Sequence, residues 1–115
     1  MYVTTGKWYI KKNRAKVLRA LKELARKVES TEPGTLTYRI HTPGEDSLPP
    51  ASPNEVVFVE VYKDEKAFLA HLKGKPFREF VERYGDLFVG GAKSGPFMTF
   101  EQLEPFAGFS RHARP

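Results

Sequence analysis

Hydrophobic and polar residues alternate one by one in several short stretches of the chain. Residues 35–42, TLTYRIHT, place Leu36, Tyr38 and Ile40 on one face of a strand. Residues 2–10 and 55–62 are rich in aromatic and β-branched types, and residues 97–103 close the series. The pattern therefore predicts four strands.

Two other stretches follow the longer period of a helix. The first starts after Asn13, a plausible N-cap, and ends at Pro33 and Gly34. Its apolar stripe consists of Val17, Leu18, Leu21, Leu24, Ala25 and Val28. The second starts at Asp64, is broken at residues 73–76, and continues as far as Phe88.

The order of these elements is β-α-β followed by β-α-β. Two such units form an α+β fold of the ferredoxin-like kind, βαββαβ, with a four-stranded antiparallel sheet and both helices on one face. Residues 43–54 hold four prolines and are expected to be an irregular loop. We expect one domain over residues 1–104 and a tail over residues 105–115.

The face of the sheet that the helices leave open is expected to be apolar. Alternation favours Trp8, Phe58 and Tyr62, or their neighbours, on this face. A second copy packed sheet against sheet would cover it, which predicts a homodimer with a barrel-like core, a dimeric α/β barrel.

Composition narrows the classes of function. The chain has no cysteine, which excludes disulfides, thiolate metal sites and cysteine nucleophiles. No apolar run is long enough for a membrane span, and the first twelve residues show no signal peptide. We therefore expect a cytoplasmic protein with no membrane partner.

The net charge of +5 raises the question of a nucleic-acid partner. Much of the positive charge lies between Lys11 and Lys27, on the solvated side of the first helix. No aromatic residue is interleaved there to stack on bases, so no nucleic-acid partner is expected.

Several short motifs resemble the antibiotic biosynthesis monooxygenase domain. Glu32-Pro33-Gly34 followed by Leu36 and Tyr38 is similar to the family's EPG-x-L-x-Y turn and strand. The segment 59–72, VEVYKDEKAFLAHL, resembles its E-x-W-x-D-x-x-A-F-x-x-H pattern, and Phe77 and Phe80 fit the stretch that follows. The resemblance covers about residues 2–103. It implies a ferredoxin-like protomer that dimerises through its sheets.

The resemblance also implies candidate activities. Members of the family include small oxygenases that oxidise anthrone-like or quinol-like aromatics without metal or flavin. Others degrade haem, cyclise or isomerise polyketides, or have no established activity. Two departures matter: Tyr62 stands where the family often has Trp, and Val81 stands where haem-degrading relatives have their proximal His. The usual axial ligand is thus absent, and no cofactor is expected.

His71 is the first candidate for catalysis, because a neutral imidazole can take a proton from a phenol or an activated C–H. The alternative is a helix histidine that only supports the fold. Arg39 and Tyr62 are candidates for stabilising oxyanion character. Candidates for substrate binding are Trp8, Tyr38, His41, Phe58, Phe68 and Tyr84. Each could equally be a core or surface residue.

No metal site is expected, because His41, His71 and His112 are far apart and show no ligand spacing. The first hypothesis, which the family resemblance implies, is a cofactor-independent monooxygenase that acts on a small anthrone- or quinol-like aromatic. The alternatives are an oxygen-independent cyclase, dehydratase or isomerase, and a non-catalytic dimer that binds a small molecule.

Overall fold

The computed structural model describes residues 1–90 and 98–111, and in this part of the chain four strands form one sheet. They are β1 (Tyr2–Tyr9), β2 (Thr35–His41), β3 (Glu55–Tyr62) and β4 (Thr99–Leu103). Their order across the sheet is β2-β3-β1-β4, and each neighbouring pair is antiparallel. The predicted α+β, ferredoxin-like sheet is confirmed.

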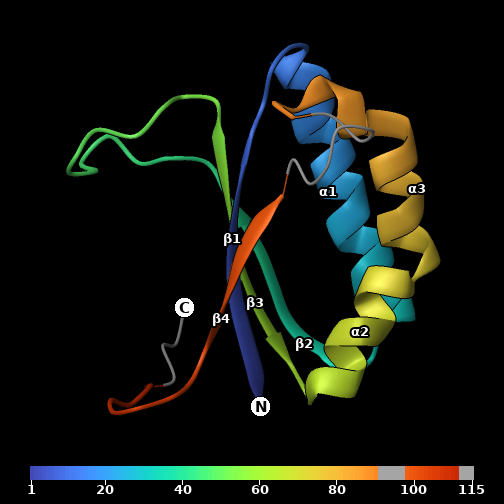
Figure 1. Ribbon diagram of the computed structural model, residues 1–115, viewed down its shortest axis with the longest axis vertical. Helices are drawn as coiled ribbons and strands as arrows, with labels where there is room; N and C mark the ends of the chain where they lie inside the picture. Colours follow the sequence, from blue (N-terminus) through green and yellow to red (C-terminus); the bar gives the residue numbers. More distant parts are fainter. Residues whose placement is uncertain (91–97, 112–115) are drawn as a thin grey trace.

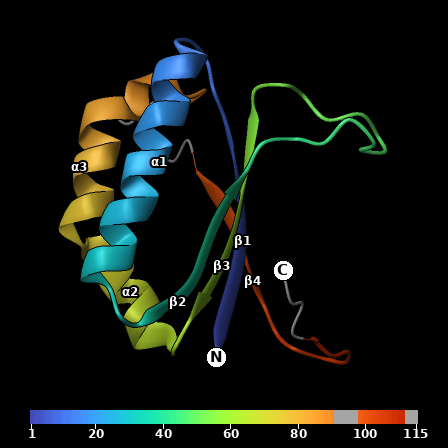
Figure 2. The same cartoon turned by 180° about the vertical axis from the view of Figure 1, so that it is seen from behind.

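The helices all lie on one side of this sheet (Figures 1 and 2). They are α1 (Arg14–Thr31), α2 (Glu65–Lys73), α3 (Lys75–Tyr84) and a short 3₁₀ turn, η1 (Gly85–Leu87). The second helical region breaks at Gly74, as the Gly74-Lys75-Pro76 sequence predicts. The predicted continuation to Phe88 is wrong: α3 ends at Tyr84, and Phe88 forms a β-bridge with Ile10.

The two predicted helix caps behave differently. The side chain of Asp64 accepts a hydrogen bond from the backbone N–H of Ala67 at 2.8 Å, as an N-cap does. Asn13 also occupies the N-cap position, but its backbone is left-handed (φ 57°) and its side chain makes no capping bond. Asparagine tolerates this conformation, so Asn13 serves as a bend rather than as a cap.

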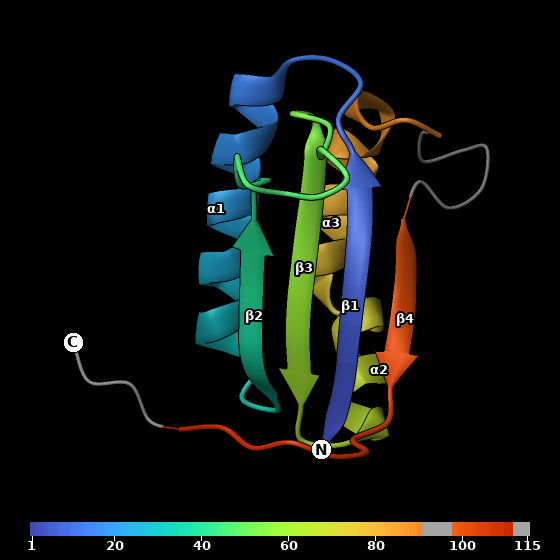
Figure 3. The same cartoon turned by 90° about the vertical axis from the view of Figure 1, so that its left-hand side faces the viewer.

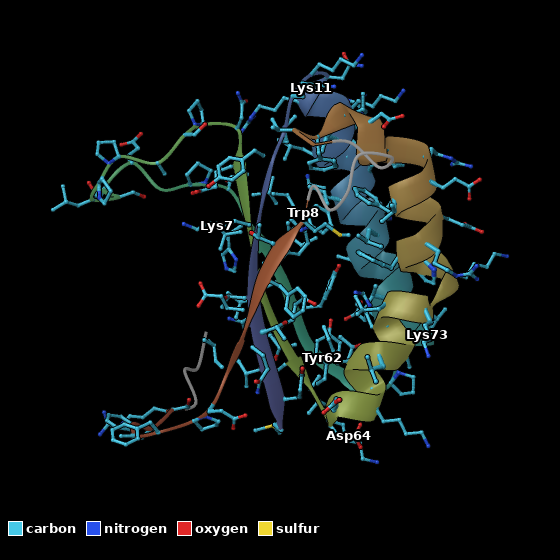
Figure 4. The ribbon with its side chains drawn as sticks, in the orientation of Figure 1. Lys7, Trp8, Lys11, Tyr62, Asp64 and Lys73 are labelled. Carbon is cyan, nitrogen blue, oxygen red and sulfur yellow. The ribbon has the colours of Figure 1, made fainter. Side chains whose placement is uncertain are left out.

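The core lies between the sheet and the helices. Its centre is an aromatic cluster around Trp8, made of Phe58, Phe77, Phe80 and Phe88. Trp8, Phe58 and Tyr62 therefore do not lie on the open face, and of the two alternatives expected there, their neighbours occupy it. The three side chains are 5%, 1% and 0% exposed, and Trp8 and Tyr62 lie on the helix side of the sheet (Figure 4). The alternating pattern shows which residues of a strand share a face. It does not show which of the two faces the helices cover, because that depends on tertiary packing.

The opposite face of the sheet is uncovered by any described helix (Figure 3). Strand pairing places on it the alternate residues Val3, Lys7, Arg39, His41, Val57, Val59, Val61 and Leu103. The irregular loop 43–54 and residues 104–111 extend from the sheet on this same side (Figures 1 and 2). The end of the predicted tail, with His112, lies outside the described residues.

Helix length and hydropathy bear on membrane insertion. Among residues 1–90 and 98–111, every helix is too short or too polar to cross a bilayer.

Candidate active site

An interior cavity of about 190 Å³ lies between the sheet and helices α2 and α3. One group of residues around it is apolar: Trp8, Phe68, Leu72, Phe77, Met98 and Phe100. The polar residues that line it are Thr4, Tyr38, Glu60, His71 and Thr99. Such a mixture, mostly apolar with a few polar side chains, is typical of a site for a small organic molecule.

Three of the polar residues form one row across the sheet. Tyr38 on β2 pairs with Glu60 on β3, which pairs in turn with Thr4 on β1. Residues that pair across antiparallel strands share a face, and adjacent strands are about 4.8 Å apart. The row therefore gives the cavity a polar strip, whose three side chains all face the helices.

His71 completes this polar part of the cavity from α2. Its side chain is 2% exposed, and its Nδ1 atom lies 2.7 Å from Oε1 of Glu32. The hydroxyl of Thr35 also donates to Oε1, at 3.2 Å. A carboxylate beside Nδ1 favours the tautomer that keeps its proton on that nitrogen. Nε2 is then the nitrogen available to accept a proton.

Glu32 reaches His71 because the turn after α1 packs closely against α2. A Cβ on Gly34 would lie only 2.8 Å from the Cβ of Ala67 on α2, so this approach requires a glycine. The N–H of Lys63, just after β3, also donates to the carbonyl of Gly34 at 2.8 Å. The EPG turn is thereby fixed between the last residues of β3 and the helix that carries His71.

Tyr62 stands behind the cavity rather than on its surface. Its hydroxyl donates a hydrogen bond to Oε1 of Glu60, two residues earlier on the same face of β3. Tyr62 does not itself line the cavity, whereas Glu60 does. Tyr62 therefore affects the cavity only indirectly, by orienting the carboxyl group of Glu60 through this hydrogen bond.

Burial shifts the protonation of this cluster. Desolvation raises the pKa of Glu60, although the hydrogen bond from Tyr62 and the nearby His71 act to lower it. Desolvation, with the Glu60 charge as a further cause, raises the pKa of Tyr38 and that of Tyr62. Both phenols consequently stay protonated and remain hydrogen-bond donors.

The structure brings together only part of the set of residues predicted from the sequence. Trp8, Tyr38, Phe68 and His71 line the cavity. Phe58 lies beneath Trp8, with ring centroids 4.1 Å apart, and does not line the cavity.

Three other predicted residues lie away from the cavity. Tyr84 packs against Phe80 and borders a different, shallow hollow between α1 and α3. Arg39 and His41 lie on the open face of the sheet, where a ring nitrogen of His41 lies 3.3 Å from the carbonyl of Val57. A site that contains His71 therefore does not include them within one protomer.

Glu32 and Glu60 were not among the candidates from the sequence, although both stand in the motifs quoted for the family. A signal for Glu60 was present: on β3 it alternates with Val56, Phe58 and Tyr62, so a carboxylate falls on the most apolar face in the chain. The contact between Glu32 and His71 spans 39 residues, and the local sequence carries no signal for it.

A larger hollow of about 660 Å³ lies on the other side of the Glu32–His71 pair. It is bordered by the end of α1, the EPG turn, α2 and the start of α3, and includes Pro33, Ala67, Ala70 and Pro76. Its walls are mostly small residues at the surface. The smaller interior cavity, which collects the buried polar groups, is the better candidate for chemistry.

Metal binding finds no support in the described residues. No three His, Cys, Asp or Glu side chains in residues 1–90 and 98–111 are grouped so that they could hold a metal ion.

Comparisons with solved structures identify the fold. A structure described as antibiotic biosynthesis monooxygenase matches with a TM-score of 0.72 and 21% identity, covering 93% of this chain and 100% of that one. The Pseudomonas aeruginosa protein PA3566 matches at 0.70 and 20%, covering 92% and 94%. A Lactobacillus acidophilus NCFM protein matches at 0.71 and 23% over 90% of this chain, which spans only 43% of that protein.

Identities of this size show the fold alone, and no curated protein matches the chain. The family follows from a separate comparison, in which the family model described as "Antibiotic biosynthesis monooxygenase" matches residues 1–83, well over half of the sequence. With a fold, motifs and family model that agree, the chain belongs to the antibiotic biosynthesis monooxygenase family.

Proposed function

We propose that the protein is a cofactor-independent monooxygenase that oxidises a small hydroxylated aromatic, with His71 as the base. The observation that carries this proposal is the Glu32–His71 pair at 2.7 Å, with the His71 ring on the wall of a mostly apolar interior cavity. General-base catalysis requires a base within hydrogen-bond reach of the hydroxyl proton, and the His71 ring on the cavity wall is placed to provide one.

The reaction would begin with transfer of a proton from the substrate hydroxyl to Nε2 of His71. The Glu32 carboxylate at Nδ1 stabilises the imidazolium that forms. The electron-rich substrate anion then reduces dioxygen. For a dihydroxyaromatic, one oxygen atom enters the ring to give a hydroxyquinone and the other leaves as water, so the substrate supplies all four electrons.

The volume of this partly open cavity indicates how much of a substrate it can surround. At about 190 Å³ it is smaller than the roughly 300–1,000 Å³ typical of sites for drug-sized ligands. It is somewhat larger than the ~150 Å³ engineered cavity that holds benzene. A quinol-like compound of one or two rings fits this space better than a three-ring anthrone.

We also propose that the protein acts as a homodimer through its sheet faces. Val57, Val59 and Val61 form an apolar stripe along β3, beside Val3 and Leu103 on the neighbouring strands. A second copy would bury this stripe. Sedimentation equilibrium tests the proposal: a monomer at all concentrations would contradict it, and Val59→Lys should weaken a dimer.

Oxygen uptake by chelator-treated protein tests the oxygenase proposal. A panel of one- and two-ring dihydroxyaromatics should give uptake above the buffer rate, and His71→Ala should abolish it while circular dichroism stays unchanged. Glu82→Ala is the control variant, because Glu82 is exposed on α3, outside both the cavity and the open face of the sheet, and its loss should leave uptake intact. Uptake that survives His71→Ala would overturn the role of His71.

The presence of two acid–base groups, His71 and Glu60, on one cavity favours a second candidate function. Together they could move a proton within a substrate, as an isomerase or a dehydratase requires. Turnover of a substrate under nitrogen would support this candidate. Binding without turnover in air or nitrogen would instead favour a non-catalytic role.

A further inference from the structure

We propose that Glu60 is a substrate-recognition residue, and that the substrate carries two hydroxyl groups on adjacent ring carbons, one bound by His71 and the other by Glu60. This inference rests on the proposed function, because it assumes that an aromatic substrate occupies the interior cavity. It adds a residue that the sequence did not suggest, and it narrows the substrate class.

Glu60 and His71 belong to the same end of the cavity. The ring of His71 lies 5.1 Å from that of Tyr38 and 5.6 Å from that of Tyr62, measured between centroids. Glu60 is the cross-strand partner of Tyr38 and accepts the hydrogen bond of Tyr62. His71 and Glu60 therefore both lie beside Tyr38 and Tyr62, and both line the same cavity.

The remainder of the cavity offers few partners for a substrate hydroxyl, since the one further polar side chain there, Thr99, already donates its hydroxyl to the carbonyl of Lys7 at 3.0 Å. Trp8, Phe77, Met98 and Phe100 line it with apolar side chains. A hydroxyl that is buried against such groups loses its hydrogen bonds to water and forms none with the protein, so its burial weakens binding. A substrate with oxygens at opposite ends would place one of them there.

His71 and Glu60 can each accept a hydrogen bond from one of two adjacent hydroxyl groups of a substrate. With the proton of the His71 imidazole held at Nδ1 by Glu32, Nε2 accepts one hydrogen bond. The Glu60 carboxylate, held in place by Tyr62, can accept a second. The Thr4 hydroxyl in the same cross-strand row is buried and has no partner in the described part of the chain, so the row retains unused hydrogen-bonding capacity.

The test compares two isomers that differ only in where their oxygens lie: 2,3-dihydroxynaphthalene, with adjacent hydroxyls, and 2,6-dihydroxynaphthalene, with hydroxyls at opposite ends. Binding is measured under nitrogen by calorimetry, so that no chemistry is needed. Trp8 is the single tryptophan of the sequence and lines the cavity, so the shift of its one indole N–H resonance reports where the ligand binds.

We expect the 2,3-isomer to bind at least about tenfold more tightly, the effect of leaving one hydroxyl unpartnered in the other isomer. Glu60→Met, which removes the carboxylate but keeps the side-chain volume, should abolish this preference, so that the two isomers bind about equally. Glu60→Met leaves the buried hydroxyl of Tyr62 without its acceptor, which could unfold the protein. The double variant Glu60→Met/Tyr62→Phe avoids this, because it removes both hydrogen-bond partners. Glu82→Met, an exposed position on α3, is the matched control and should keep the preference.

Equal binding of the two isomers, no shift of the Trp8 resonance, or a preference that persists without Glu60 would each overturn the inference. These outcomes are separable from failure of the proposed function. A preference for the 2,3-isomer without oxygen uptake would retain the recognition role and reject the oxygenase. Oxygen uptake that depends on His71, together with equal binding of the two isomers, would retain the oxygenase and reject the recognition role of Glu60.

Discussion

The Nδ1 atom of His71 on α2 lies 2.7 Å from Oε1 of Glu32, which follows the last residue of α1. The two residues are 39 positions apart, and both side chains are largely buried. The contact holds the imidazole and favours the tautomer with its proton on Nδ1, which leaves Nε2 as the acceptor nitrogen. In the proposed reaction Glu32 would be a positioning residue for His71, with no need to contact the substrate itself.

Replacing Glu32 with Gln should therefore lower kcat by about a hundredfold or more while it changes KM little. A neutral amide cannot stabilise the imidazolium, and its NH₂ group can donate to Nδ1 and favour the wrong tautomer. Steady-state oxygen uptake gives the kinetic constants, and ¹⁵N NMR of His71 gives the tautomer. An unchanged tautomer together with unchanged kcat would contradict the positioning role; Glu29→Gln, exposed on α1, is the control.

The raised pKa of Glu60 should make stability depend on pH in an unusual direction for a carboxyl group. Because the folded state binds this proton more tightly than the unfolded state, the contribution of Glu60 is fully present below the ordinary value of 4.5. It is lost as pH rises from that value through the raised pKa of the folded state. Glu60→Gln, which cannot ionise, should therefore gain stability relative to the wild type as pH increases across this window.

Urea unfolding of the two proteins, from a pH below 4.5 to neutrality, measures this difference. Glu82→Gln should track the wild type at every pH, because Glu82 is exposed. A gap between Glu60→Gln and the wild type that stays constant, or that moves the other way with pH, would show that burial does not disfavour the ionised carboxyl.

The close approach of the EPG turn to α2 can be tested by a double-mutant cycle. Gly34→Ala should destabilise the protein by about 1–3 kcal/mol, since the new Cβ would lie 2.8 Å from that of Ala67. Ala67→Gly alone should cost about 1 kcal/mol through helix propensity. The double variant should be more stable than the sum predicts, because removal of the Ala67 methyl makes room for the new one.

Thermal or urea unfolding of all four proteins gives the coupling energy. Additive effects would mean that the two residues do not share the space. Gly44→Ala is the control, because a Cβ there meets no atom within 4 Å.

Much of the fold could be predicted from periodicity, because strands and helices impose different spacings on their apolar residues. The alternation of β2, the apolar stripe of α1 and the break at Gly74 each reflect a local property of the backbone. The end of the second helical region was harder to predict. Phe88 continues the helical spacing, but its bridge to Ile10 is a contact between distant segments.

The candidate site was predictable only in part. His71, Trp8, Tyr38 and Phe68 were among the candidates and line one cavity, but that cavity lies between the sheet and the helices, not on the open face where Trp8 was expected. Arg39, only one residue from Tyr38, was expected to act with His71 but lies on the other face of the sheet. A single step along a strand reverses the direction of the side chain, so the sequence defines two sets of residues without saying which one meets the helices.

The sequence by itself determined the order of elements, their approximate bounds, the family resemblance and the chemical types available for a site. These depend on local spacing and residue identity. The tertiary structure alone decided that Glu32 meets His71, that Tyr62 acts behind Glu60, and that Trp8 faces inward. Such relationships arise where α1, α2 and β3 pack together. A contact between distant segments does not change the spacing of apolar residues in either segment, so the sequence pattern does not reveal it.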